Sequence, residues 1–211
     1  MTQTIEQITT GQASSLLSQY HYLGDKPFRH SIIYGIVPDN RNFGDATIYG
    51  ALVFHKVSAP ETVVGAFGLE RDDQEGIFEL GRLVVHPSLN GGNHTSQFVS
   101  KSIRLLQHSC NVRAIISYAD SSAGHLGSIY RACNALYCGT TTQKKDFYVD
   151  GKIQERGKTK GIVGEWKDRP IKHRYVWLFD KSLKLNWIVE KYNQVGIPNW
   201  MGKNITVAEW C

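Results

Sequence analysis

The stretch from Ser117 to Gly139, SYADSSAGHLGSIYRACNALYCG, contains the residue types best suited to chemistry. An apolar run ends in Asp120, a turn of small residues follows, and the next segment carries Tyr130. A carboxylate can accept a proton or hold an amine, and a tyrosine hydroxyl beside a reacting centre can act as a general acid. Helix capping and packing are the alternative roles of these side chains, and their types alone leave both interpretations open.

The elements around this stretch would place its polar side chains at one cleft. The run VRAIISYAD is typical of a strand, and residues 124–136 are predicted to form a helix. Asp120 would then lie at the carboxyl end of a strand, where open α/β sheets hold their ligands. In such a helix Tyr130, Asn134 and Tyr137 share one stripe and could line the cleft together.

A glycine-containing loop is the second candidate site. The residues SLNGGNHTS follow the predicted strand GIFELGRLVVHP and precede a predicted helix with Thr95 or Ser96 as its N-cap. Backbone amides freed by Gly91 and Gly92, together with the helix N-terminus, could bind an anion such as a pyrophosphate. An ordinary strand–helix connection that uses glycine for positive φ is the alternative.

The rest of the chain predicts an α+β protein. Residues 3–20 are weakly helical, whereas ATIYGALVFHKV and TVVGAFGLE are predicted to form an antiparallel strand pair. The further strand-like runs are SIIYGIV, DFYVDG, GKIQERG and RYVWLFD. At 211 residues, the sequence favours one domain, 1–211, with a central βαβ unit.

Composition excludes several classes of protein. There is no run of about 18 apolar residues, so a membrane partner is not expected, and the four cysteines lack the C-x-x-C spacing of a zinc site or a disulfide scaffold. A reduced, cytoplasmic protein fits better. The net charge is +5, yet residues 141–184 hold nine Lys and three Arg against six acidic residues. This local excess favours a polyanionic partner, with solvated surface charge as the alternative.

Several motifs in one order carry a family resemblance. LVVHP-SLNGGN, AIISYAD and SIYRACNALYCG resemble the central core of the GNAT acyltransferase superfamily. With HYLG, FELGRLVV and KHRYVWLFD, they more narrowly resemble the Mom family of phage DNA-modification proteins over residues 18–180. The resemblance implies a GNAT-like fold with a mixed, mostly antiparallel sheet flanked by helices. It also implies an enzyme of the host cytoplasm that converts adenine N6 in phage DNA to a carbamoylmethyl derivative, which protects the DNA from host restriction.

The resemblance also implies the site residues. The matching motifs place catalytic residues at His21, Tyr22, Asp120 and Tyr130. The residues expected to bind substrate or cofactor are Glu79, Arg82, Gly91, Gly92, Ser96, His125 and Asn134. Acyl-CoA or another small activated donor is the expected cofactor. The resemblance raises an iron ion as well, with His21 as a candidate ligand, although no metal-binding spacing is present.

The basic region is expected to contact double-stranded DNA. Within residues 141–211, the predicted DNA-binding residues are Lys144, Lys145, Lys172, His173 and Arg174. Such cations would neutralise phosphates, and the aromatic residues interleaved with them could stack on a displaced base. Reaction at adenine N6 requires the base to leave the duplex stack or the strand to open. Sheet packing is the alternative for the aromatic residues of RYVWLF.

Two other functions stay open at this point. One is a conventional acyl-CoA-dependent N-acetyltransferase acting on a protein or a small amine, although SLNGGNHTS lacks the R/Q-x-x-G-x-G/A loop of that class. The other is a non-catalytic DNA-binding protein that has kept the fold. The sequence does not define the donor, the DNA sequence context or the oligomeric state, for which a homodimer is one alternative.

Overall fold

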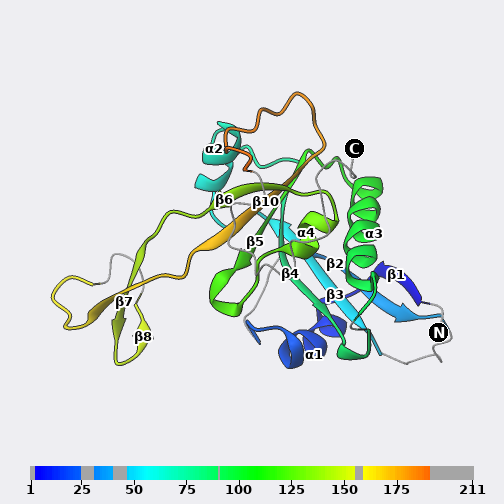
Figure 1. Cartoon of the computed structure of the whole chain (residues 1–211), viewed down its shortest axis with the longest axis horizontal. Coiled ribbons are helices and arrows are strands. Elements are labelled where there is room, and N and C mark those ends of the chain that lie inside the picture. The colour runs from blue at the N-terminus through cyan, green and yellow to red at the C-terminus, as the bar shows by residue number, and fades with distance from the viewer. Residues whose placement is uncertain (1–2, 25–30, 40–46, 90, 155–158, 191–211) are drawn as a thin grey trace, which may run out of the picture.

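The computed structural model describes residues 3–24, 31–39, 47–89, 91–154 and 159–190 (Figure 1). Its α-helices are α1 (Thr10–Tyr20), α2 (Glu61–Phe67), α3 (His94–Ser109) and α4 (Ser128–Ala132). Single 3₁₀ turns follow β4 and β5, at Pro87–Leu89 and Ser121–Ala123. The strands are β1 (Gln3–Gln7), β2 (Ser31–Pro38), β3 (Gly50–Lys56), β4 (Ile77–Val85), β5 (Ala114–Asp120), β6 (Leu136–Thr140), β7 (Lys145–Val149), β8 (Lys152–Ile153), β9 (Glu165–Asp168) and β10 (Lys172–Leu178).

The main sheet confirms the mixed, mostly antiparallel arrangement expected from the sequence. Its order is β1-β2-β3-β4-β5-β10-β6. Each neighbouring pair is antiparallel except β4 and β5, which are parallel and are joined through α3. This βαβ unit brings the carboxyl end of β5, with Asp120, to the centre of the sheet.

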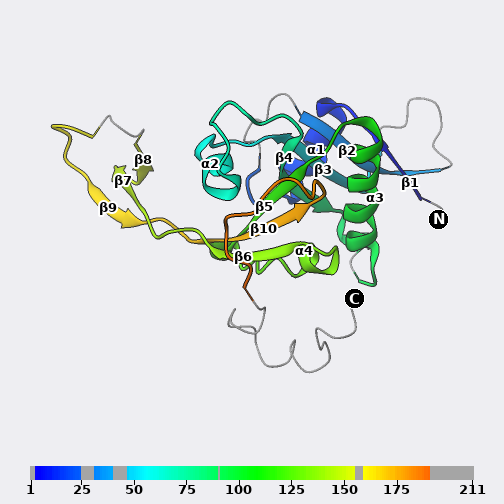
Figure 2. The ribbon, with the colours of Figure 1, turned by 90° about the horizontal axis from the view of Figure 1, so that it is seen from above.

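Helices cover both faces of the sheet because successive strand residues point to opposite sides. On β3, Leu52 and Phe54 join the core beneath α3, whereas Ala51 and Val53 join the core beneath α1. A third buried cluster packs α2 against β5 and β10. Figure 2 shows α4 on one side of the sheet and α1 and α2 on the other. No helix among the described residues combines the length and the apolar character needed to cross a membrane.

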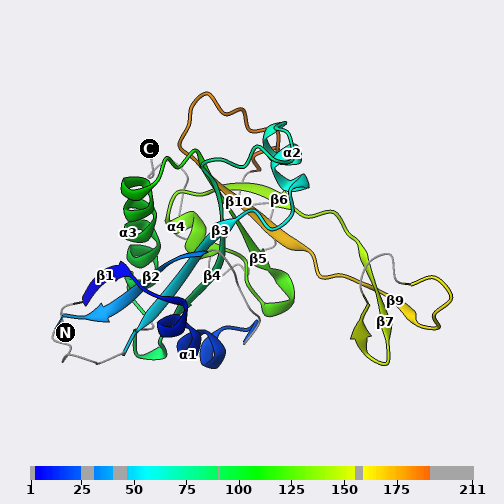
Figure 3. The same ribbon diagram turned by 180° about the vertical axis from the view of Figure 1, so that it is seen from behind.

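A second, three-stranded sheet projects from the body as an arm (Figures 1 and 3). We define the arm as residues 144–169, of which 155–158 lie outside the described residues; its strand order is β8-β7-β9. Phe147 is buried in it and packs on Trp166, with ring centroids 5.1 Å apart. The chain leaves and re-enters the body at one point, because Thr141 N donates to Lys172 O at 2.8 Å and Lys172 N donates to Thr141 Oγ1 at 3.0 Å.

Three local predictions were wrong. TVVGAFGLE contains the helix α2, whose buried Val63, Ala66 and Phe67 follow the helical period, and Gly68 ends it at φ 68°. The helix predicted over residues 124–136 is only α4, because Asn134 takes φ 63° just beyond it. The weakly helical segment 3–20 begins as the edge strand β1 before α1 starts.

Candidate functional site

The site lies where β4 and β5 cease to pair. Their parallel register runs from Ile77 opposite Ala114 to Leu80 opposite Ser117, and both strands continue beyond it. On its other edge β4 has a bulge, since Val53 pairs with Arg82 and Phe54 with Leu80. The extra residue is Gly81, and a bulge of this kind bends its strand locally. The end of the pairing and the bulge together open the sheet at Gly81.

Two cavities meet at this opening. The larger, about 930 Å³, is lined by Lys56, Glu79, Arg82 and Lys172 among others, and it faces the root of the arm. The smaller, about 380 Å³, lies between β4, β5, the first turn of α3 and the loop before α4. Tyr22, Gly81 and Tyr118 line both cavities. The two cavities therefore adjoin, with Tyr22, Gly81 and Tyr118 in the wall that they share.

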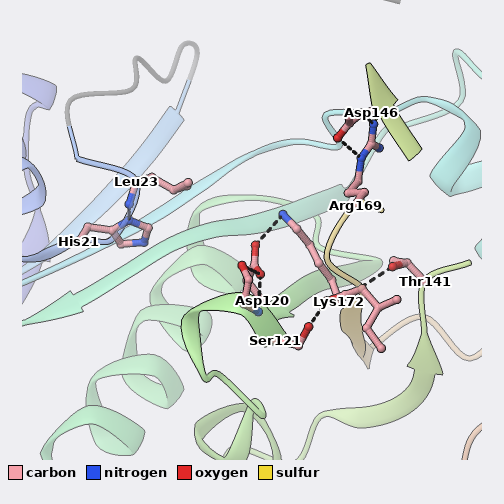
Figure 4. Close-up of polar contacts among 10 residues, drawn as sticks. His21, Leu23, Asp120, Ser121, Thr141, Asp146, Arg169 and Lys172 are labelled. Carbon is pink, nitrogen blue, oxygen red and sulfur yellow. Dashed lines mark hydrogen bonds and ion pairs between the residues drawn. The ribbon is translucent and has the colours of Figure 1, made fainter. Parts of the chain in front are cut away.

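His21 and Tyr22 lie together at the end of α1, beside the smaller cavity. Their rings stack with centroids 4.7 Å apart, and the Tyr22 ring approaches that of His125 at 5.5 Å. The Leu23 backbone N–H donates to His21 Nδ1 at 3.1 Å (Figure 4). Burial, followed by the charge of Arg82 and of His125, lowers the pKa of His21 to about 4. His21 is therefore neutral at physiological pH, with its proton on Nε2.

The lowered pKa of His21 predicts a pH-dependent stability. The unfolded chain takes up a proton below pH 6.5 while the folded chain resists until about pH 4, so stability falls as pH drops through this window. The loss should be roughly 1–2 kcal/mol, less than the full shift would give, because His21 is partly exposed and solvent screens its charge. In His21→Asn, whose amide oxygen can still accept from Leu23 N, the free energy of unfolding should vary less between these pH values. Urea denaturation across this range measures it, with the exposed His108→Asn as the control.

A wild-type-like pH dependence in His21→Asn would contradict the assignment of this window to His21. An equal flattening in His108→Asn would contradict it as well, because that exposed side chain near the end of α3 is far less desolvated in the folded state.

Asp120 caps the 3₁₀ turn that follows β5 and also joins this turn to the root of the arm. Its Oδ1 accepts hydrogen bonds from Ser122 N at 3.0 Å and from Ser122 Oγ at 2.6 Å. Its Oδ2 lies 3.5 Å from Lys172 Nζ (Figure 4). Burial acts to raise the pKa of Asp120, but the Ser122 hydrogen bonds and the charge of Lys172 outweigh it and hold this pKa below its ordinary value. The carboxylate is therefore ionised and largely occupied.

Tyr130 belongs to α4 and forms part of the wall of the smaller cavity. Its ring packs on Tyr175 and Trp177, with centroids 5.4 and 5.7 Å away. Burial raises the pKa of the Tyr130 hydroxyl above its ordinary value, partly offset by a hydrogen bond with Ser117. The hydroxyl therefore keeps its proton at neutral pH.

Comparison with protein families identifies the chain. The model of the Mom protein family matches residues 2–194. The chain belongs to the Mom protein family. The match confirms the narrower resemblance drawn from the sequence motifs and includes both cavities and the arm. No curated protein matches the chain significantly.

The solved structures most useful for comparison are GNAT acetyltransferases, which confirms the fold of this Mom family member. A Bacillus subtilis acetyltransferase in complex with CoA is 16% identical, with a TM-score of 0.51 over 84% of this chain and 99% of that one. NAA60 of Arabidopsis thaliana, in complex with a bisubstrate analogue, is 11% identical, with a TM-score of 0.56 over 85% of this chain and 100% of that one. Identities this low establish a shared fold.

The structure gathers most of the catalytic and binding residues expected for the Mom family. Residues of the smaller cavity include His21, Tyr22, Asp120, His125 and Tyr130, and those of the larger include Tyr22, Glu79 and Arg82. Arg82 is buried and donates to Gly24 O at 3.2 Å, which fastens the loop after α1 to β4.

Other predicted residues lie elsewhere. Gly91 and Gly92 are exposed in the loop before α3, and the Ser96 hydroxyl donates to Asn93 O at 3.0 Å. Asn134 is exposed beyond α4, away from Tyr137 on β6, so the stripe predicted for Tyr130, Asn134 and Tyr137 does not form.

The predicted DNA-binding residues also separate into two groups. Lys144 and Lys145 are exposed at the base of the arm, and Lys172 lines the larger cavity. His173 is instead buried, with Nδ1 3.1 Å from the Tyr137 hydroxyl, and Arg174 lies over the Trp187 ring at 4.5 Å. Both side chains thus contact other residues of the chain, and their predicted DNA contacts stay predictions. Residues 191–211 of the predicted DNA-binding region lie outside the described residues.

The described residues do not fit an iron site. No group of three His, Cys, Asp or Glu side chains suited to a metal ion occurs within the described part of the chain. His21, the predicted ligand, accepts a hydrogen bond at Nδ1 from the Leu23 amide. A neutral imidazole then carries its proton on Nε2, which removes the lone pair that a metal would need.

The structure also reveals site residues that the sequence did not single out. Tyr118 lies in the wall shared by the two cavities, and His55 lines the larger one. Thr95, one of the two N-cap residues expected from the sequence, lines the smaller cavity, whereas the N-cap of α3 is Asn93. His55 lies on β3 opposite Glu79 of β4. The pairing register of these two strands, including its bulge, decides this placement, and the sequence carries no clear signal of that register.

Proposed function

We propose that the chain transfers a small group from an activated donor to N6 of adenine in double-stranded DNA, giving a carbamoylmethyl derivative that protects phage DNA from host restriction. Membership of the Mom family supports this assignment. The observation that carries it is the position of the arm, which starts beside the larger cavity and extends away from the body (Figure 1). A polymeric acceptor could contact the arm and enter the larger cavity at the same time, whereas a small amine would have no need of the arm.

The smaller cavity is the proposed donor chamber. It reaches Thr95 in the first turn of α3. Gly91 and Gly92 precede this helix, with φ values of 105° and 56°, and Asn93, the N-cap residue, makes no side-chain capping bond. Backbone amides at the start of this 16-residue helix are therefore suited to a pyrophosphate. Structures of similar fold contain CoA or acetyl-CoA, which supports an acyl-CoA donor. Attack of adenine N6 on an acyl-CoA thioester would release the thiolate and give an N6-acyl adenine. The carbamoylmethyl product needs N6 bonded to a methylene carbon, so another small activated donor with its leaving group on that methylene would supply it in one step.

The larger cavity is the proposed acceptor chamber, and the arm would hold the DNA that enters it. Among the described residues of the arm, the exposed lysines are Lys144, Lys145, Lys152, Lys160 and Lys167. Exposed apolar side chains accompany them, with Val163 93% exposed and Trp166 58% exposed. Cations together with uncovered apolar and aromatic surface suit the phosphates and the faces of bases. Lys172 links the arm to Asp120 at the edge of the chamber.

The protein residues have separate tasks in this proposal. Tyr130 donates its hydroxyl proton to the leaving group in the donor chamber, because burial keeps that hydroxyl protonated. Tyr22 lies between the chambers and offers a ring on which a displaced adenine could stack, beside neutral His21. Asp120 holds Lys172 and the root of the arm in place.

Nucleoside analysis tests the proposed function. The chain is expressed in bacteria, and nucleosides from digested host DNA are examined by mass spectrometry. A deoxyadenosine species heavier by a carbamoylmethyl group is expected, and its absence from a culture that contains folded protein would overturn the proposal. Thermal stabilisation by acetyl-CoA together with no DNA affinity would favour a conventional acetyltransferase. Salt-sensitive DNA binding with unaltered nucleosides would favour a DNA-binding protein without activity.

The arm lysines provide a prediction about affinity. Replacing Lys144 and Lys145 with alanine should weaken binding to duplex DNA of any sequence and reduce the slope of log affinity against log salt by about 0.9 for each phosphate that is no longer neutralised. Fluorescence anisotropy of a labelled duplex at several salt concentrations measures this slope. Lys101→Ala, on the exposed face of α3, is the matched control. A double variant with the wild-type slope would show that these lysines do not bind phosphates.

A further inference from the structure

The far end of the arm carries two neighbouring apolar side chains that face solvent. This end is the loop before β9, which lies farthest from the body (Figures 1 and 2). We call residues 159–164 the tip. Ile162 is 44% exposed and Val163 is 93% exposed, the highest value for a large hydrophobic residue in the described part of the chain. The Val163 side chain therefore contributes almost nothing to folding and stands where a partner can reach it.

A tight turn fixes the chain just before Val163. Ile162 N donates to Thr159 O at 3.3 Å, which closes a turn through Lys160 and Gly161. Gly161, the third residue of the turn, has φ +76°, a conformation that favours glycine at this position. The direction in which the chain leaves the turn is therefore set by the backbone.

A close contact fixes the chain just after Val163. A Cβ atom on Gly164 would lie 2.3 Å from Tyr148 O and 2.7 Å from Phe147 Cζ, so the backbone of Gly164 packs directly on β7. Phe147 is itself buried in the arm. Val163 thus projects from a backbone that is held on both sides, and a side chain held in this way loses little further freedom on binding.

The charge beside the tip indicates the kind of partner. Lys160 is the only charged residue of the tip, and it is exposed. Lys152 and Lys167 are exposed farther along the arm, and Lys167 Nζ lies 2.5 Å from Glu165 Oε1. A duplex presents phosphates to cations and, where a base step opens, apolar base faces as well. Apolar side chains next to an exposed lysine match both parts of such a step.

We propose that Val163 enters duplex DNA as a wedge between two neighbouring base pairs and kinks the duplex there, an inference that rests on the proposed function. Proteins that kink DNA in this way insert an apolar side chain from the minor groove and partly unstack one step. Ile162 would cover the edge of the opened step, and Lys160 would neutralise an adjacent phosphate. Pyrimidine–purine steps unstack most readily, so the tip selects such a step.

The length of the arm limits the distance between the kinked step and the target adenine. Lys172, which lines the acceptor chamber, follows Val163 by nine positions. An extended chain of this length covers at most about 32 Å, and the duplex rises about 3.4 Å per step, so the kink lies within about nine steps of the target. Adenines that have a pyrimidine–purine step within this distance should therefore be modified preferentially.

Val163→Ser tests the wedge, because it removes the apolar side chain and keeps Lys160. Energy transfer between dyes at the two ends of a short duplex should report a bend of about 20–90° with the wild type and a nearly straight duplex with the variant. Affinity for the duplex should fall about tenfold, as expected for the loss of one stacking contact. The yield of modified deoxyadenosine should fall as well. The dependence of affinity on salt should stay unchanged, because the lysines are retained.

Two further variants serve as controls. Val163→Leu keeps an apolar wedge and should keep the bend. Val189→Ser changes a valine that is 50% exposed and lies outside the arm, so it should bend and modify DNA as the wild type does. The melting temperature of Val163→Ser should equal that of the wild type, because the side chain it replaces is almost fully exposed.

The outcomes separate the inference from the proposed function. If the wild type modifies deoxyadenosine but leaves the duplex straight, or if Val163→Ser bends it equally, the wedge is wrong although the function stands. If the wild type bends the duplex but leaves deoxyadenosine unmodified, the proposed function is wrong and the wedge stands. A wild type that does not bind the duplex overturns both. An altered oligomeric state of Val163→Ser in sedimentation, with bending unchanged, would assign the tip to a contact with a second copy of the chain.

Discussion

Tyr130→Phe should lower adenine modification about a thousandfold while leaving the fold intact. General acid catalysis contributes about 10²–10⁴-fold, and a value in the middle of this range is expected because the hydroxyl serves a partly enclosed chamber. The phenylalanine ring can occupy the same space against Tyr175 and Trp177, so packing is conserved. The amount of modified deoxyadenosine per cell, normalised to the amount of folded protein, measures the effect.

The control for this prediction is another partly buried tyrosine. Tyr49 packs on the core beneath α3 and contacts His86 at a centroid distance of 5.9 Å. Tyr49→Phe should retain activity close to that of the wild type. Undiminished modification by Tyr130→Phe would show that another group, or water, supplies the proton to the leaving group.

The largest effect on stability is expected from Gly127→Ala. Gly127 has φ +72°, a conformation that costs an alanine about 1 kcal/mol. Its Cβ would also lie 2.3–2.9 Å from three atoms of the fully buried Tyr175 ring, and overpacking of this kind costs about 1–3 kcal/mol. The total loss in the free energy of unfolding, from urea denaturation, should be about 3 kcal/mol.

Gly124→Ala is the matched control for the stability prediction. It has nearly the same φ, +71°, but no atom lies within 4 Å of the position that its Cβ would take. This variant should lose only the backbone contribution of about 1 kcal/mol. If the two variants were equally destabilised, the contact with Tyr175 would contribute nothing.

The parts of the site that could be predicted from the sequence are those determined by local pattern. The run of apolar residues ending in Asp120 indicates both the strand and its carboxyl end, and β5 ends there. Pro87 and the two glycines after it likewise indicate the end of β4 and the loop before α3. Proline and glycine restrict or release the backbone in ways that hardly depend on the rest of the fold.

Predictions from the local sequence pattern were wrong where burial or a single turn determined the structure. Val63 and Val64 favour a strand by intrinsic propensity, but packing of Val63 and Phe67 against the sheet stabilises α2. The short α4 begins only after Gly127, whose left-handed conformation accommodates the Tyr175 ring from a strand far along the chain. The pairing register of β3 and β4 places His55 at the site, and the sequence does not define this register.

The hydrogen bonds between Thr141 and Lys172 make the arm an exchangeable module. The ends of the inserted segment are held together by the main sheet, so the entropy of closing that segment hardly depends on its length or composition. Insertions at such a junction are tolerated because few contacts cross it. If the arm binds DNA as proposed, a chimera that carries a foreign hairpin between these two residues should keep the main sheet and lose the DNA affinity of the arm.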